Sequence, residues 1–137
     1  MVVTSWLVDK SAALRIARSP RAELWQERLE RGLLRVSTVT LLEMGFSVRT
    51  ATEHESWVET GPAALMPVEP ITPGAEDRAV AVQRALALRG QHRSASIPDL
   101  LVAAVGELAD LTVLHVDKDF DLIAEVTGQS VERLDVD

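Results

Sequence analysis

Short apolar runs alternate with amphipathic segments along this chain of 137 residues. The runs at 5–8, 33–37, 67–71, 111–116 and 131–134 have the length and composition of strands. Apolar residues at helical spacing predict helices at 11–18, 20–31, 52–60, 72–88, 97–108 and 120–126. One more helix is predicted to carry the apolar residues from 41 to 48, with Thr38 or Thr40 as its N-terminal cap. This alternation predicts an α/β fold, with helices on both faces of a central, mostly parallel sheet.

Length and composition predict one domain over residues 1–137. Hydrophobic residues make up 47% of the chain and charged residues 26%, as in globular proteins. No apolar run approaches the roughly 20 residues that cross a bilayer, and we see no signal peptide. The chain has no cysteine, which excludes disulfides and thiolate metal sites and fits the cytoplasm. We therefore expect a cytoplasmic protein that does not engage a membrane.

The net charge of −7 is unevenly distributed. Residues 1–50 carry eight basic and five acidic side chains (+3), residues 51–100 carry four and seven (−3), and residues 101–137 carry two and nine (−7). This distribution argues against a uniformly basic surface for nucleic acid. It permits a local basic rim beside an acidic pocket that binds cations.

Four acidic residues lie among apolar residues or at strand ends: Asp9, Glu43, Asp99 and Asp117. The carboxyl ends of parallel strands and the helix starts that follow them meet in one crevice. Carboxylates gathered there repel one another unless they are protonated or bridged by a cation. Oxygen ligands suit Mg²⁺ or Mn²⁺, and such an ion can activate water and stabilise charge on a phosphodiester. We therefore predict a cation site formed by these acids.

Structural explanations for the same acids stay open. Ser96 and Asp99 have the spacing of a capping box, and the acids of 117–121 could cap the helix that follows. Glu43 is harder to explain in this way, because a lone carboxylate among residues expected to be buried is costly.

Two other kinds of site fit poorly. A calcium loop beginning at Asp117 would need Gly at position 122 and Glu at position 128, where Leu122 and Gly128 stand. A phosphatase of the haloacid dehalogenase type would need Asp at position 11, where Ser11 stands. No Gly-rich phosphate loop supports a nucleotide-dependent enzyme.

Four segments of the chain resemble PIN-domain proteins, and specifically the VapC-type toxins of bacterial toxin–antitoxin pairs. They are Leu7-Val-Asp-Lys-Ser-Ala, Leu42-Glu-Met, Ile97-Pro-Asp-Leu-Leu-Val-Ala-Ala and Asp117-Lys-Asp-Phe-Asp-Leu-Ile-Ala. The resemblance spans nearly the whole chain, in the family's order. It implies an Mg²⁺- or Mn²⁺-dependent endoribonuclease that cleaves structured RNA such as tRNA and thereby inhibits translation and growth. The resemblance makes Asp9, Glu43, Asp99 and Asp117 the catalytic acids, and these four with Asp119 the metal ligands. Either Asp117 or Asp119 is the closer ligand; we favour Asp117 and take Asp119 as an outer member.

The resemblance also implies partners. These are a cognate VapB-type antitoxin, a second copy of the chain in a homodimer, and a toxin–antitoxin hetero-oligomer. Candidates for a groove that receives an antitoxin helix are Trp25, Leu29, Phe46 and Trp57, although such a stripe also suits a core. The alternative function is a non-catalytic PIN-like interaction module with a vestigial cation site.

The chain departs from the family pattern at two positions. Lys10 stands where the family usually has Thr, although Ser11 keeps a hydroxyl nearby, and Lys10 could contact a phosphate, a carboxylate or only solvent. His115 stands where the family favours another Thr, and its apolar strand favours a core histidine over a base. Further candidates for RNA contact are Arg15, Arg18, Arg49, His92 and Arg93.

Overall fold

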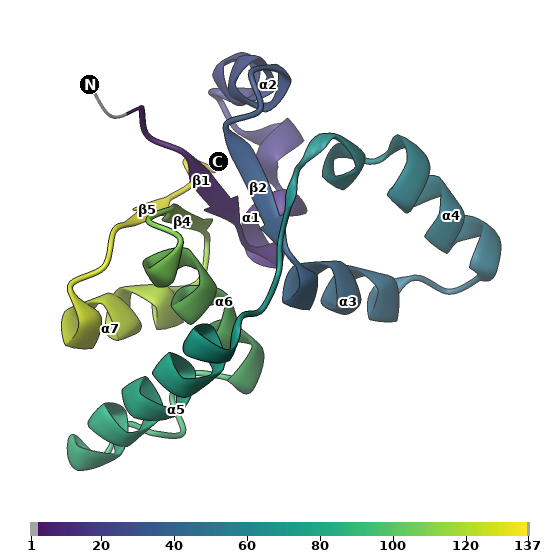
Figure 1. Ribbon diagram of the computed structural model, residues 1–137. Coiled ribbons are helices and arrows are strands. Elements are labelled where there is room, and N and C mark those ends of the chain that lie inside the picture. Colours follow the sequence, from purple (N-terminus) through teal and green to yellow (C-terminus); the bar gives the residue numbers. More distant parts are fainter. Residues whose placement is uncertain (1–2, 137) are drawn as a thin grey trace.

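The computed structural model of the protein describes residues 3–136, which form a five-stranded sheet in the order β3-β2-β1-β4-β5 (Figure 1). All four neighbouring strand pairs are parallel. The strands are β1 Trp6–Val8, β2 Leu34–Ser37, β3 Val68–Glu69, β4 Thr112–His115 and β5 Val131–Arg133. The predicted α/β class is therefore confirmed, and the sheet is parallel throughout.

Helices connect the strands. They are α1 Lys10–Ala13, the 3₁₀ helix η1 Ile16–Arg18, α2 Ala22–Glu30, α3 Thr38–Ser47, α4 Ala51–Thr60, the 3₁₀ helix η2 Pro62–Leu65, α5 Pro73–Leu88, α6 Ile97–Leu108 and α7 Lys118–Thr127. The continuous helix expected over 11–18 is wrong, because the backbone of Arg15 (φ −120°, ψ −8°) separates α1 from η1. The expected cap of α3 is also wrong. Strand β2 runs straight into α3, so Ser37 is the cap and accepts the N–H of Thr40.

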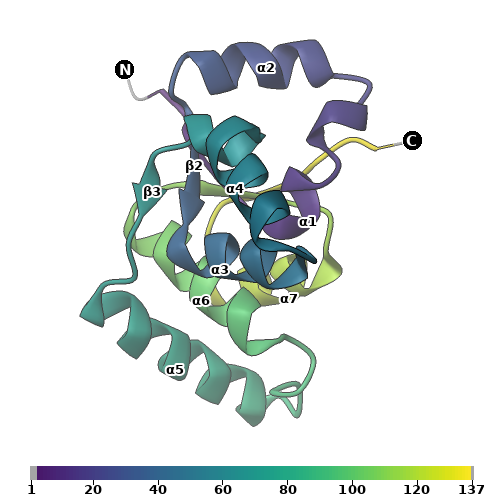
Figure 2. The same ribbon diagram turned by 90° about the vertical axis from the view of Figure 1, so that its right-hand side faces the viewer.

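Helices cover both faces of the sheet, as predicted (Figure 2). Successive strand residues point to opposite faces. Leu7 and Val113 pack against α5, α6 and α7 on one face, whereas Trp6 and Val8 pack against α1, η1 and α2 on the other. Both clusters are almost fully buried, so the central strands are fixed from both sides.

The strand order creates a switch point at β1. The chain leaves β1 to build β2 and β3 on one side, then returns to build β4 and β5 on the other. Connections that leave in opposite directions open a crevice at the carboxyl ends of the strands, where α/β proteins bind ligands. Asp9 follows β1 at this edge, and Asp117 follows β4.

Helix α3 contradicts one expectation about its apolar residues. Only Val39 and Thr40 are buried, whereas the side chains of Leu42 and Phe46 are 68% and 91% exposed. The reason is visible in Figure 1, where α3 and α4 extend to the side of the sheet. In the part of the chain that the structure describes, no helix is long and apolar enough to cross a membrane.

Candidate metal centre

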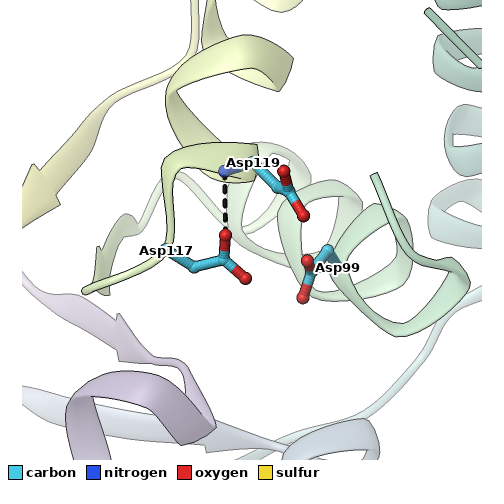
Figure 3. Close-up of side chains that lie close together, drawn as sticks. All are labelled: Asp99, Asp117 and Asp119. Atoms are coloured by element: carbon cyan, nitrogen blue, oxygen red, sulfur yellow. Dashed lines mark hydrogen bonds between the residues drawn. The ribbon is translucent and has the colours of Figure 1, made fainter. Parts of the chain in front are cut away.

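Three carboxyl groups form what we call the acidic cluster: those of Asp99, Asp117 and Asp119. One oxygen from each lies within 4.8 Å of the others. Asp99 lies in the first turn of α6, and Asp117 and Asp119 lie at the start of α7. Figure 3 shows the three side chains turned toward one another. Two helix starts that are neighbours only in the folded chain thus converge on one point.

Asp117 both caps a helix and belongs to the acidic cluster. Its Oδ1 accepts the N–H of Asp119 at 2.9 Å, and its other oxygen remains on the side of Asp99 (Figure 3). His115 stabilises the same turn, because its Nδ1 accepts the N–H of Asp117 at 3.2 Å. Burial lowers the pKa of His115, which favours the neutral ring, and because Nδ1 accepts a hydrogen bond the ring proton belongs on Nε2. His115 is therefore a core histidine that positions Asp117.

Asp9 is held by a bridge between the two central strands. Its buried carboxylate accepts the N–H of Ser11 at 3.0 Å and the O–H of Ser11 at 2.7 Å, both on Oδ2. The Ser11 Oγ in turn accepts the N–H of Val116 at 3.0 Å. One hydroxyl thus joins the end of β1 to the end of β4 and fixes Asp9 between them.

The carboxylates share what we call the acidic pocket, a cavity of about 410 Å³. Its lining comprises Asp9, Lys10, Ser11, Leu14, Arg15, Glu43, Ser96, Asp99, Asp117 and Asp119. All five acids that the sequence nominated are therefore brought to one cavity. Asp9 and Glu43 line the same cavity but do not belong to the group of ligand atoms within 4.8 Å of one another.

Crowding shifts the proton affinity of Asp99. Burial, together with the charges of Asp9, Asp117 and Asp119, raises its pKa from 3.8 to about 7, against a hydrogen bond with Ser96 that lowers it. Asp99 is thus half-protonated near neutral pH unless a positive charge arrives.

The neighbouring acids are shifted in the same direction. Burial and the charge of Asp117 raise the pKa of Asp119, and burial and the charge of Asp9 raise the pKa of Glu43. The Oε1 of Glu43 is buried, and no hydrogen-bond donor among the described residues reaches it. Excess negative charge, buried oxygens and an all-carboxylate donor set are what a divalent oxygen-seeking cation requires. The residues therefore fit Mg²⁺ or Mn²⁺.

The basic candidates divide into two groups. Lys10 and Arg15 line the acidic pocket, where Lys10 donates to Ser47 Oγ at 3.0 Å and Arg15 donates to the carbonyl of Ser11 at 2.8 Å. The remaining candidates are exposed and lie outside the lining: Arg18, Arg49, His92 and Arg93.

Two serines of the site were not nominated as site residues from the sequence. Ser96 lines the pocket and caps α6 by accepting the N–H of Asp99, and its spacing from Asp99 was a usable signal. Ser47 anchors Lys10 from α3, one helical turn after Glu43. The only signal in the sequence for the role of Ser47 was its position one helical turn after Glu43.

Comparison with known proteins agrees with the fold. Residues 6–126 match the sequence model of the PIN domain. The chain is 55% identical to Ribonuclease VapC2 of Mycobacterium tuberculosis (strain CDC 1551 / Oshkosh) over 129 residues, which are 94% of this chain and 92% of that protein. It is 40% identical to Ribonuclease VapC21 of the same strain, over 96% of this chain and 94% of the relative. The chain therefore belongs to the PIN-domain family and, within it, to the VapC group.

Solved structures share the architecture at low sequence identity. A chain from the crystal structure of DNA-bound VapBC from Salmonella typhimurium aligns with a TM-score of 0.75 and 16% identity, over 96% of this chain and 98% of that chain. A chain from VapBC2 of Rickettsia felis, bound to a promoter DNA fragment, aligns with a TM-score of 0.78 and 11% identity, over 96% of this chain and 100% of that one. These similarities establish a common fold.

Proposed function

We propose that this chain is a divalent-metal-dependent endoribonuclease and the toxin of a toxin–antitoxin pair, with residues 1–137 forming one nuclease domain. The observation that carries the proposal is the acidic cluster in a pocket shared with Asp9 and Glu43. The relatives at 55% and 40% identity are both named ribonucleases, which supports the same activity here.

Each acid has a role in this proposal. Asp99, Asp117 and Asp119 would hold Mg²⁺ or Mn²⁺, and Asp9 and Glu43, which line the same pocket, would complete the ligands or orient water. As the family resemblance implies, the proposed catalytic acids are Asp9, Glu43, Asp99 and Asp117, with Asp119 as an outer metal ligand. A divalent cation bound there would supply hydroxide near neutral pH and would neutralise charge on the phosphodiester. Ser11 supports Asp9 through its 2.7 Å hydrogen bond.

The substrate we propose is structured RNA such as tRNA, whose cleavage inhibits translation and growth. A chain of net charge −7 does not hold RNA by a broad basic surface. Binding therefore depends on a few local contacts, for which Arg15 at the pocket and Arg93 in the loop after α5 are candidates. Unpaired bases in loops give such a protein its sequence selectivity.

We also propose a VapB-type antitoxin and a homodimer as partners. Two solved structures with this fold are VapBC complexes. Trp25 and Leu29 are core residues here, but they also line an apolar cavity of about 460 Å³ beside η2 that suits the side chains of a partner helix. The side chain of Phe46 is exposed to solvent and could contact a partner, whereas Trp57 is half-buried.

Cleavage of a total small-RNA pool tests the proposal. Purified protein is incubated with Mg²⁺ or Mn²⁺, with excess EDTA, and as the Asp99→Asn variant. We expect discrete fragments that disappear in EDTA and in the variant, and their ends identify the substrate. The matched control is Asp77→Asn, which removes an exposed carboxylate on α5 and leaves cleavage unchanged.

A negative result is also informative. If no RNA is cleaved and neither metal changes the melting temperature, the metal-dependent nuclease is refuted. The alternative function, a non-catalytic interaction module with a vestigial cation site, then replaces it.

A further inference from the structure

Phe46 is the one aromatic residue that the fold leaves exposed within residues 3–136, which include all three Trp and both Phe of the chain. It is 91% exposed, whereas Trp57 is half-buried and the other three are buried: Trp6, Trp25 and Phe120. An exposed ring adds almost no buried apolar area to the folded state. The stability of the fold therefore does not explain an aromatic ring at this position of α3.

Phe46 lies close to the acidic pocket. It follows Glu43, which lines the pocket, by three residues, and it directly precedes Ser47, whose Oγ accepts Lys10 Nζ at 3.0 Å. Residues three apart on a helix have Cβ atoms about 5–6 Å from each other. Helix α3 contacts both α1, which carries Lys10, and α6, which carries Asp99. The ring is therefore about one helical turn from the lining of the pocket.

Other exposed apolar side chains accompany the ring. Leu42 precedes Phe46 by four residues, which makes the two side chains neighbours on the surface of α3. Leu14 is also exposed and belongs to the lining of the pocket itself. The surroundings of the acidic pocket thus offer apolar surface as well as charge.

The charges of the acidic pocket favour an uncharged group as the occupant of this surface. Five carboxylates line the pocket, against one lysine and one arginine, so the pocket repels an RNA backbone wherever no cation neutralises it. The bases of single-stranded RNA are uncharged, and they stack on aromatic side chains. Stacking does not depend on a basic surface, so it suits a chain of net charge −7.

We propose that Phe46 stacks on an unpaired RNA base beside the scissile phosphate and thereby determines where this chain cuts. The inference rests on the proposed function and adds a substrate-positioning residue to it. The stacked base fixes the register of the strand, so that the neighbouring phosphate enters the acidic pocket. Stacking needs a flat aromatic face, whereas contact with a partner protein needs only apolar area, and this difference can be measured.

Replacement of Phe46 with Ala, Leu and Trp tests the stacking. Each protein is incubated with the total small-RNA pool and Mg²⁺ or Mn²⁺, and the rates at which discrete fragments appear are compared. Phe46→Ala and Phe46→Leu should cleave about 5- to 150-fold more slowly, as expected for the loss of one stacked base, and Phe46→Trp should keep the rate. The melting temperature should not change, because the ring is exposed. The matched control is Leu88→Ala, which removes a similarly exposed apolar side chain at the end of α5 and should keep the wild-type rate.

A synthetic RNA that spans the mapped cleavage site identifies the stacked base. The base is removed in turn from each of the two nucleotides that flank the scissile phosphate. At one of these positions, loss of the base should slow the wild type and leave the rate of Phe46→Ala unchanged, because the base and the ring form one contact. Rate losses that add up independently at both positions overturn the stacking.

Light scattering after size-exclusion chromatography separates RNA contact from protein contact. If Phe46→Ala loses both self-association and cleavage, and Phe46→Leu restores both, the stacking is overturned and the ring belongs to a protein interface. An unchanged rate in Phe46→Ala also overturns the stacking and leaves the nuclease standing. If the wild type itself cleaves no RNA, the proposed function fails, and this inference fails with it.

Discussion

Replacing Asp99 with Asn should make the metal-free protein more stable, although it destroys the proposed site. Asp99 is 7% exposed, and its pKa rises from 3.8 in the unfolded chain to about 7 in the folded one. The folded chain therefore holds the proton more tightly than the unfolded chain. This stabilisation is complete below the unfolded pKa and is lost as pH rises through about 7.

The size of the effect follows from the pKa difference. Each pKa unit corresponds to about 1.4 kcal/mol, so an ionised Asp99 costs about 4 kcal/mol of unfolding free energy at pH 8 in the absence of metal. The cost falls below about 1 kcal/mol at pH 4, where the carboxyl group is protonated in the folded chain. Asn has the same shape and cannot ionise, so about 4 kcal/mol is the upper limit of what Asp99→Asn gains at pH 8.

Urea unfolding at pH 4 and pH 8 in EDTA measures the difference, and the same titrations with 10 mM Mg²⁺ test the metal. The unfolding free energy of the wild type should rise by about 2.7 kcal/mol if the metal is present at 100 times its dissociation constant, and that of Asp99→Asn should rise by less. Asp77→Asn, at an exposed position of α5, should stay within about 0.5 kcal/mol of wild type under each condition. Equal stability of wild type and Asp99→Asn at pH 8 would refute the proposed crowding of negative charge.

Three further predictions concern packing, support and pH. Gly106→Ala should destabilise the fold by about 1–3 kcal/mol in urea titrations, because the new Cβ would lie 2.8 Å from Cγ2 of Val113; Gly74→Ala, whose Cβ would meet nothing closer than 3.5 Å, should not. Ser11→Ala should cost about 1–3 kcal/mol by leaving the N–H of Val116 without its partner, and should slow RNA cleavage, whereas Ser11→Thr should retain both properties. The affinity for Mn²⁺, measured by calorimetry, should weaken by up to about tenfold for each pH unit below 7, because the metal must displace a proton from the acidic cluster. An affinity that does not change between pH 5.5 and pH 8 would contradict this prediction.

Much of the site geometry followed from elementary rules about strand ends. Acids at the carboxyl ends of parallel strands had to converge, and the short apolar runs marked those ends. The capping explanation and the metal explanation for Asp117 turn out to be compatible. One oxygen caps α7, and the other remains on the side of Asp99. A choice between the two explanations was therefore unnecessary.

The sequence could not reveal features that depend on how far each helix lies from the sheet. Helix α3 carries Leu42 and Phe46 at helical spacing, which predicted burial, yet both are exposed because α3 meets the sheet only through its first turn. The contact of Lys10 with Ser47 spans 37 residues and depends on the same placement. Periodicity identifies an apolar face but does not say what lies opposite it.

The bridge from Ser11 to Val116 affects how this protein matures on the ribosome. Its two halves are 105 residues apart in sequence. At elongation rates of 5–20 residues per second, roughly 5 to 20 seconds pass between the synthesis of Asp9 and that of its partner strand. Until β4 is made, the nascent chain holds only part of the acidic pocket. Truncated or stalled translation products therefore lack the assembled site, and a cell making a toxin of this design is exposed to its activity only after nearly the whole domain has been synthesised.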